Sequence, residues 1–421
     1  SDFRSSFVVC NSSVLSRDSI MPPKRRKVNS SRSQSLSGDS ELQTRRIRRE
    51  TIATINSLID DDASIDLKRL RIVATERGLV NNEIRRRVWP ILLNVDVSRS
   101  KHIHDADIST HRDYEQIEVD IPRSMLRFLD DVNEMDQERK RQALRRIIHG
   151  VALKHPDVHY YQGFNDICSV FLLVAGEPAA FAMAERIALY HLGDACTQTL
   201  LPVMLILELL FPLVNLVDPE VHSFLISSSV MPDVAIEWLI TWFSHSLDSL
   251  DKVARLFDVF LSSHPAMPLY LAAAAILQVR TGLLQCECEF SAVHHYLKRL
   301  PSHLNVERLI KTSLDIFRRY PPKEVQELSG IFLPPTSHFH DDPKVWTDGH
   351  PLPNPQDPIP KCLPSRSRRR SGDAAHRYRE TANENDGPGR PPWYWNVTVW
   401  SVSIALVAVA ALTHVAMTRR Q

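Results

Sequence analysis

The chain has 421 residues, a formal net charge of +1 and only 12 glycines. Leucine, isoleucine and alanine are plentiful and strict apolar–polar alternation is almost absent, so we expect an all-α fold. The balanced charge gives no sign of a nucleic-acid-binding surface. A P-loop sequence is absent, which argues against a nucleotide phosphate site of the chain's own. The 6 cysteines lack a framework spacing and are interpreted as reduced thiols.

The N-terminal residues 1–43 are rich in serine and arginine, and we expect them to be disordered. Met21 is an alternative start of translation, which would leave residues 1–20 out of the protein. The basic stretch 22–28 resembles a nuclear localisation signal. We interpret it instead as a solvated basic tail, or one that touches anionic lipid, because an apolar C-terminal segment would compete with nuclear import.

A helical domain is expected over residues 44–330. Helices are predicted, in chain order, near residues 51–59, 67–77, 83–93, 137–154, 163–174, 200–217, from 219, 232–245, 249–262, 268–284, 292–300 and 306–319. The apolar stretches 200–217 and 268–284 contain prolines or charged residues. They are therefore interpreted as buried helices rather than membrane spans.

The segment Ile117–Arg123 is predicted to be a loop that ends in an arginine. Pro122 has a fixed φ and disfavours a helical conformation at Ile121, so we expect extended chain just before Arg123. Asp120 lies three residues before Arg123 and can hold its guanidinium when no ligand is bound.

A second segment, Tyr160–Gly163, places a glutamine beside a glycine. Gly163 has no Cβ, so we expect the backbone of another molecule to approach closely there. An arginine that neutralises charge on the transferred phosphoryl group and a glutamine that orients the attacking water are the two groups that GTP hydrolysis needs. Arg123 and Gln162 are the candidates for these roles.

These residues resemble the TBC domain of Rab GTPase-activating proteins, which carries I-x-x-D-x-x-R, Y-x-Q and R-x-x-x-W motifs. The motifs read here, in the family's order, as Arg85 and Trp89, then Ile117, Asp120 and Arg123, then Tyr160 and Gln162. The resemblance covers about residues 65–320. Each motif alone is weak, but the three together are specific.

The resemblance implies an all-α TBC domain that activates the GTPase reaction of a GTP-bound Rab protein. Arg123 would then reach over the γ-phosphate, and Gln162 would take the place of the Rab protein's own glutamine. Asp120 would hold Arg123, and Tyr160 would anchor the glutamine segment. The chain would need no cofactor of its own, because GTP and magnesium belong to the Rab protein.

Two other functions stay open: a catalytically inactive TBC scaffold that binds Rab proteins, and an unrelated helical adaptor anchored by its tail. Arg85 and Trp89 lie four residues apart on one predicted helix, and we interpret them as structural, with Trp89 in the core. A zinc site is not favoured, because the spacing of the nearby cysteines and histidines matches no common site: Cys286, Cys288, His294 and His295.

The C-terminal part begins with a proline- and arginine-rich linker, predicted over residues 331–392. Residues 393–417 start with aromatic residues and continue as an apolar run that meets the ~20 residues needed to span a bilayer. We expect a tail anchor with the bulk of the protein in the cytosol, since the longer basic flank precedes the span. Resemblance to an anchored member of the family implies the endoplasmic reticulum membrane and an early-secretory Rab such as Rab1.

Overall fold

The computed structural model describes residues 31–59, 65–99, 108–125, 128–129, 132–300 and 304–352. Across these ranges every regular element is a helix, as the composition predicted. The chain divides into two units, with the boundary after Glu50. The predicted tail up to residue 30, the segment 353–392 and the predicted membrane span lie outside the described residues.

Helix α1 (Ser31–Ile59) crosses the boundary between the units. The disordered tail was predicted to reach residue 43, but the helix already begins at Ser31, so that boundary was wrong. Glutamate, leucine and arginine after residue 40 are good helix formers, and Arg46 pairs with Glu50 one turn later at 2.7 Å. Within the second unit, Ile55 and Leu58 of this helix are buried in the core.

The second unit contains the remaining helices. In chain order they are α2 (Leu67–Glu76), α3 (Asn82–Leu92), α4 (Tyr114–Asp120), α5 (Glu134–Lys154), α6 (Phe164–Ala175), α7 (Glu177–Leu189), α8 (Leu201–Glu208), α9 (Leu210–Val217), α10 (Pro219–Ser227), α11 (Ile236–Ile240), α12 (Leu250–Phe260), α13 (Met267–Gln278), α14 (Arg280–Leu283), α15 (Phe290–Lys298), α16 (Val306–Arg319), α17 (Pro322–Ser329) and α18 (Lys344–Thr347).

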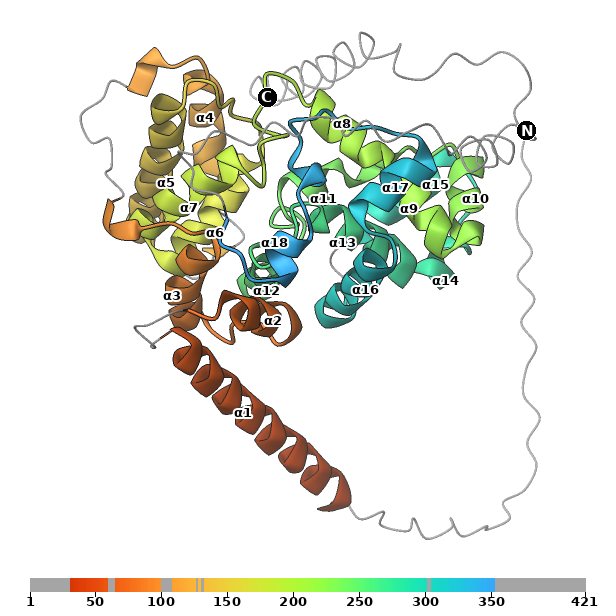
Figure 1. Ribbon diagram of the computed structural model, residues 1–421, viewed down its shortest axis with the longest axis horizontal. Helices are drawn as coiled ribbons and strands as arrows, with labels where there is room; N and C mark the ends of the chain where they lie inside the picture. Colours follow the sequence, from red (N-terminus) through yellow and green to blue (C-terminus); the bar gives the residue numbers. More distant parts are fainter. Residues whose placement is uncertain are drawn as a thin grey trace, which may run out of the picture. The chain divides into compact units, whose positions relative to one another are not determined.

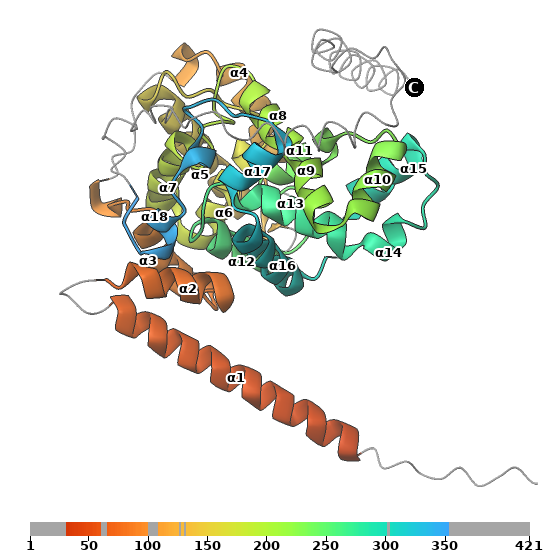
Figure 2. The same ribbon diagram turned by 45° about the vertical axis from the view of Figure 1, so that its right-hand side comes forward.

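Two groups of helices can be followed in Figure 1 and from a second direction in Figure 2. Helices α3, α5, α6 and α7 pack together, and α9, α13 and α16 pack together on the other side. Helix α12 contacts both α6 and α16 and so connects the two groups. The first group carries the arginine and glutamine segments at its upper end, next to α4 (Figure 1).

Capping side chains explain where several helices begin. Asp66, Asn81, Asn133, Asp218 and Ser249 each accept a hydrogen bond from a backbone N–H in the first turn of the following helix. The helix start predicted at residues 218–220 is therefore confirmed.

Buried aromatic rings hold α3, α6 and α12 together. The Trp89 ring centroid lies 5.8 Å from that of Phe171 and 5.9 Å from that of Phe257. Trp89 is fully buried, which confirms its predicted place in the core. Because α6 is clamped by these rings and by α5 and α7, the glutamine segment at its N-terminal end is attached to rigid structure.

Several elements differ from the prediction. The helix predicted to reach His245 ends at Ile240, because buried Trp242 and Phe243 adopt φ values of +50° and +62°. Helix α7 was not predicted. The helix predicted over 306–319 ends at Arg319 as expected. It was expected to be the last of the domain, but Pro322 opens α17, since a proline at the first helical position lacks only an N–H that the helix would leave unpaired.

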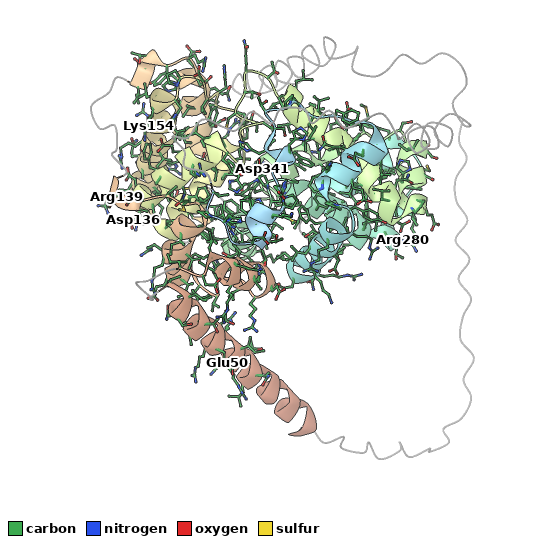
Figure 3. The ribbon with its side chains drawn as sticks, viewed as in Figure 1. Glu50, Asp136, Arg139, Lys154, Arg280 and Asp341 are labelled. Carbon is green, nitrogen blue, oxygen red and sulfur yellow. The ribbon has the colours of Figure 1, made fainter. Side chains whose placement is uncertain are left out.

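Residues 331–352 belong to the folded domain, so the linker predicted from residue 331 begins later. Phe339 and Trp346 are buried within this segment. Its Asp341 carboxylate, labelled in Figure 3, is partly exposed and accepts a hydrogen bond from the Tyr190 hydroxyl. A composition rule for linkers overlooks such isolated aromatic anchors, each of which buries a large apolar area.

Both the length and the hydropathy of a helix decide whether it can cross a bilayer, and the described helices are short or only partly apolar. No single helix among them is both long and apolar enough to cross one. Only together are the segments Pro219–Ser227 and Pro232–Ile240 long and apolar enough to cross a bilayer, and the chain bends by 110° between them. The predicted membrane span at residues 397–417 lies outside the described residues.

Candidate functional site

The arginine segment is helical rather than a loop. Helix α4 runs to Asp120 and a single turn of 3₁₀ helix, Ile121–Arg123, follows directly. The prediction of extended chain at Ile121 was wrong, because its φ of −54° and ψ of −50° are helical. Pro122 occupies the first turn of the 3₁₀ helix, where its fixed φ is tolerated, and the chain becomes extended only at Ser124.

Arg123 stands at the end of this turn with its side chain 51% exposed. Its Nη2 donates to Oδ1 of Asp120, so the expected ion pair is present. Asp120 is buried, and Gln116 one turn earlier approaches both carboxylate oxygens at 3.4 Å. One guanidinium nitrogen of Arg123 is thus held by Asp120, while about half of the side chain is exposed to solvent.

The glutamine segment is fixed on both sides of Gln162. The Tyr160 hydroxyl lies 2.7 Å from Oδ2 of Asp120, and its backbone N–H donates to Asp113 at 3.0 Å. Burial, followed by the nearby Asp120 charge, raises the pKa of Tyr160 well above its ordinary value, so the hydroxyl keeps its proton and donates. The Gln162 side chain itself is exposed.

Gly163 is required for a reason other than the one expected. Its φ is +119°, a conformation that side chains rarely adopt, and it stands immediately before α6. A Cβ there would come within 2.9 Å of Thr241 Cγ2. The close neighbour is therefore a side chain of the same protein, and Gly163 lets the glutamine segment lie against the turn after α11.

Asn165, which sequence reasoning missed, links the two segments. Its Oδ1 accepts from the Gly163 N–H at 3.0 Å and lies 3.0 Å from the Tyr160 hydroxyl. Its Nδ2 donates at 2.9 Å to the hydroxyl of Ser124, which in turn donates to the Asp120 carbonyl at 2.8 Å. Asn165 is 6% exposed. A polar residue in the first turn of a strongly apolar helix was the available signal.

The third motif lies in the core rather than at this site. Asp258 is fully buried and accepts hydrogen bonds from the Arg85 guanidinium, the Trp89 indole at 2.9 Å and the Leu79 N–H at 3.0 Å. Arg85 and Trp89 are thus structural, as interpreted from the sequence, but they act by sharing one carboxylate. No role was predicted for Asp258, although this aspartate lies between the apolar residues Phe257 and Val259 of α12.

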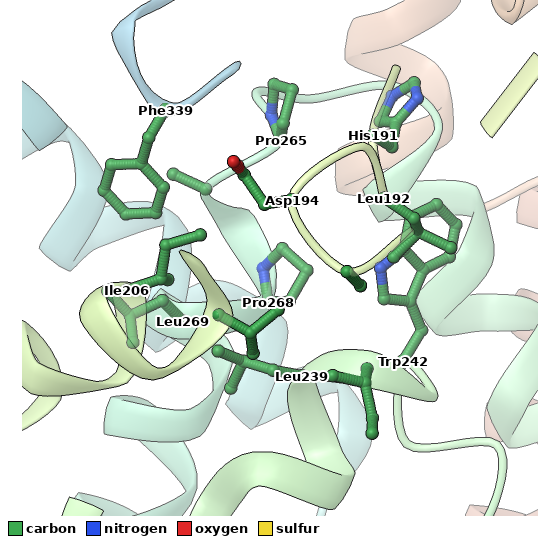
Figure 4. A pocket seen from close by; sticks show the side chains of 14 residues that line it. His191, Leu192, Asp194, Ile206, Leu239, Trp242, Pro265, Pro268, Leu269 and Phe339 are labelled. Atoms are coloured by element: carbon green, nitrogen blue, oxygen red, sulfur yellow. The ribbon is translucent and has the colours of Figure 1, made fainter. Parts of the chain in front are cut away.

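The cavity in Figure 4 lies away from these segments. It has a volume of about 50 Å³ and its lining includes His191, Asp194, Trp242 and Phe339, but none of the motif residues. Arg123 and Gln162 are instead exposed. Within the described ranges, no group of three or more His, Cys, Asp or Glu residues is arranged to hold a metal ion.

The all-helical domain and the order of its three motifs are those of the TBC domain class, and comparison with known proteins supports this assignment. A family model described as the Rab-GTPase-TBC domain matches residues 82–284. The chain belongs to this family of Rab GTPase-activating TBC domains.

Two curated relatives are similar over most of the domain. "TBC1 domain family member 20" from Homo sapiens is 37% identical over 279 residues, which cover 66% of this chain and 69% of that protein. "GTPase-activating protein gyp10" from Schizosaccharomyces pombe is 29% identical, over 59% of this chain and 68% of that protein.

The fold also matches a solved structure. The crystal structure of the Ypt/Rab-GAP domain of Gyp1p superposes with a TM-score of 0.53 at 16% identity, over 65% of this chain and 98% of that one. At this level of identity the match concerns the fold alone.

Proposed function

We propose that this protein accelerates GTP hydrolysis by a Rab protein, with Arg123 and Gln162 entering the Rab protein's nucleotide site. The observation that carries the proposal is the Asp120 carboxylate, which holds Arg123 through one oxygen and Tyr160 through the other. Tyr160 lies two residues before Gln162. The two proposed catalytic groups thus depend on one buried anchor.

In this mechanism Arg123 neutralises charge that develops on the transferred phosphoryl group, and Gln162 orients the attacking water. Both groups are exposed before the partner arrives, so little protein must be moved to reach the nucleotide. GTP and magnesium are supplied by the Rab protein, and this chain contributes only side chains. Preorganisation by Asp120 and Tyr160 lowers the entropy cost of placing them.

We further propose that the protein works at the endoplasmic reticulum membrane on an early-secretory Rab such as Rab1. The apolar residues 397–417 support an anchoring helix by length and composition. The match to the Rab-GTPase-TBC domain supports a Rab protein as substrate.

The test is single-turnover hydrolysis by a panel of purified GTP-loaded Rab proteins. Wild-type protein is expected to accelerate at least one of them, and Gln162→Ala is expected to remove most of that acceleration. Arg139→Ala is the matched control, because Arg139 is an exposed arginine on α5 that pairs with Asp136 (Figure 3). Binding of GTP-loaded Rab without acceleration by wild-type protein would favour the scaffold function instead.

A further inference from the structure

Three residues that precede α4, His111 to Asp113, contact both α5 and the glutamine segment. His111 Nε2 lies 2.7 Å from Nδ1 of His149, a fully buried residue of α5. His149 Nε2 in turn lies 2.7 Å from Glu118 Oε1, on the helix that leads to Arg123. A chain of side-chain contacts thus runs from His111 through α5 and back to α4.

The protons in this chain have one consistent arrangement. Glu118 is a carboxylate acceptor that Arg145 also contacts at 2.6 Å, so His149 must donate to it from Nε2. His149 Nδ1 is then the acceptor, and His111 donates to it from Nε2. His111 Nδ1 accepts the backbone N–H of Asp113 at 3.2 Å. Both rings are therefore neutral in this arrangement.

The next two residues contact the turn after α5 and the glutamine segment. Arg112 Nη2 donates to the carbonyl of Pro156, and Asp113 Oδ2 accepts the N–H of Tyr160 at 3.0 Å. These residues thus contact α5, the turn that follows it and the backbone two residues before Gln162. Helix α4, which follows them, leads directly into the turn that ends at Arg123. We call these three residues the clasp.

We propose that His111 and Asp113 are positioning residues for Arg123 and Gln162, and that the clasp opens when His149 gains a proton at Nδ1. A proton on His149 Nδ1 would face the Nε2–H of His111 across 2.7 Å, which removes the hydrogen bond and adds repulsion. A proton on His111 Nδ1 would leave this hydrogen bond in place. The proposal rests on the proposed function, because it concerns the same two side chains.

The charges around the rings set the direction of the pH effect. Glu118 and Tyr114 face the pair from α4, Arg145 faces it from α5, and Arg112 and Asp113 face it from the clasp itself. Burial is the largest influence and lowers the pKa of both histidines from the ordinary 6.5, although Glu118 opposes this at His149. The clasp is thus closed at the ordinary value and above, and it opens only as the pH falls through the lowered pKa of His149.

The experiment measures single-turnover hydrolysis by a responsive GTP-loaded Rab from about pH 8 down to about pH 5.5. Intrinsic hydrolysis by the Rab protein is subtracted at each pH. His149→Gln is the key variant, because its amide can accept from His111 and donate to Glu118 but does not titrate. His111→Ala and Asp113→Ala remove the clasp at every pH.

We expect the wild-type acceleration to fall as the pH is lowered from the ordinary histidine pKa of 6.5 toward about 5.5, while His149→Gln retains it there. At about pH 7.5, His111→Ala and Asp113→Ala should lower the maximal rate by about 10-fold to 100-fold, with little change in the Rab concentration that gives half-saturation. Unfolding melts at each pH separate loss of rate from loss of fold. If an alanine variant does not fold, the His149→Gln profile alone decides.

A His149→Gln profile identical to wild type, or folded His111→Ala protein with a normal rate, would overturn the inference while wild-type acceleration at pH 7.5 still stands. Absence of acceleration by wild-type protein at that pH would instead overturn the proposed function, and the positioning roles with it. The two failures are therefore distinguishable in one data set.

Discussion

The Tyr160 hydroxyl lies 2.7 Å from Oδ2 of Asp120, a residue 40 positions earlier in the chain whose other carboxylate oxygen holds Arg123. Tyr160→Phe removes this contact and leaves a buried carboxylate oxygen short of a donor. We expect a stability loss of about 1–3 kcal/mol and a clear fall in maximal GTPase acceleration.

Tyr161→Phe is the matched control for this change. Its hydroxyl also donates a buried hydrogen bond, to the Ile240 carbonyl at 2.7 Å, but it does not touch Asp120. The control should lose stability yet keep its acceleration in single-turnover assays at a temperature where both variants are folded. Equal acceleration by the two variants would show that the Asp120–Tyr160 contact has no role in positioning.

Asn165→Asp tests the link between the two segments. The substitution keeps the shape but replaces the donor toward Ser124 with an oxygen and adds a buried negative charge near Asp120. We expect a loss of about 2–3 kcal/mol or more in denaturant unfolding, because the new charge lacks a partner. Wild-type stability would mean that the amide is not needed where the structure places it.

Gly163→Ala should be destabilising for two separable reasons, the φ of +119° and the 2.9 Å approach to Thr241 Cγ2. The backbone strain alone costs about 1–3 kcal/mol. Adding Thr241→Ser, which removes the Cγ2 methyl, should recover only the steric part. Thermal melts of the single and double variants measure both contributions, and full recovery in the double variant would contradict the strain argument.

Asp258→Ala leaves the Arg85 guanidinium buried without its carboxylate and should cost about 3–5 kcal/mol. Asp251→Ala on the exposed side of α12 is the control and should change the unfolding free energy by less than about 0.5 kcal/mol. Similar melting temperatures for the two variants would show that the shared carboxylate does not stabilise the core.

Local patterns in the sequence predicted most helices and the two motif segments, because apolar periodicity, capping residues and prolines act over a few positions. They failed at Ile121, where packing of Ile117 and Ile121 into the core outweighs the conformational preference before proline. They also failed for Asn165 and Asp258, whose partners lie far away in the sequence. Such contacts depend on tertiary structure, so no local rule identifies them.

The central claim is that Arg123 stabilises the transition state of GTP hydrolysis in the Rab protein. The direct measurement is single-turnover hydrolysis by a responsive GTP-loaded Rab with saturating Arg123→Ala or Arg123→Lys protein, beside a circular-dichroism melt. Because the side chain is exposed, the fold should survive, while alanine should remove about 10³–10⁵-fold of acceleration and lysine should rescue it poorly. Near-wild-type acceleration by folded Arg123→Ala protein would contradict the account.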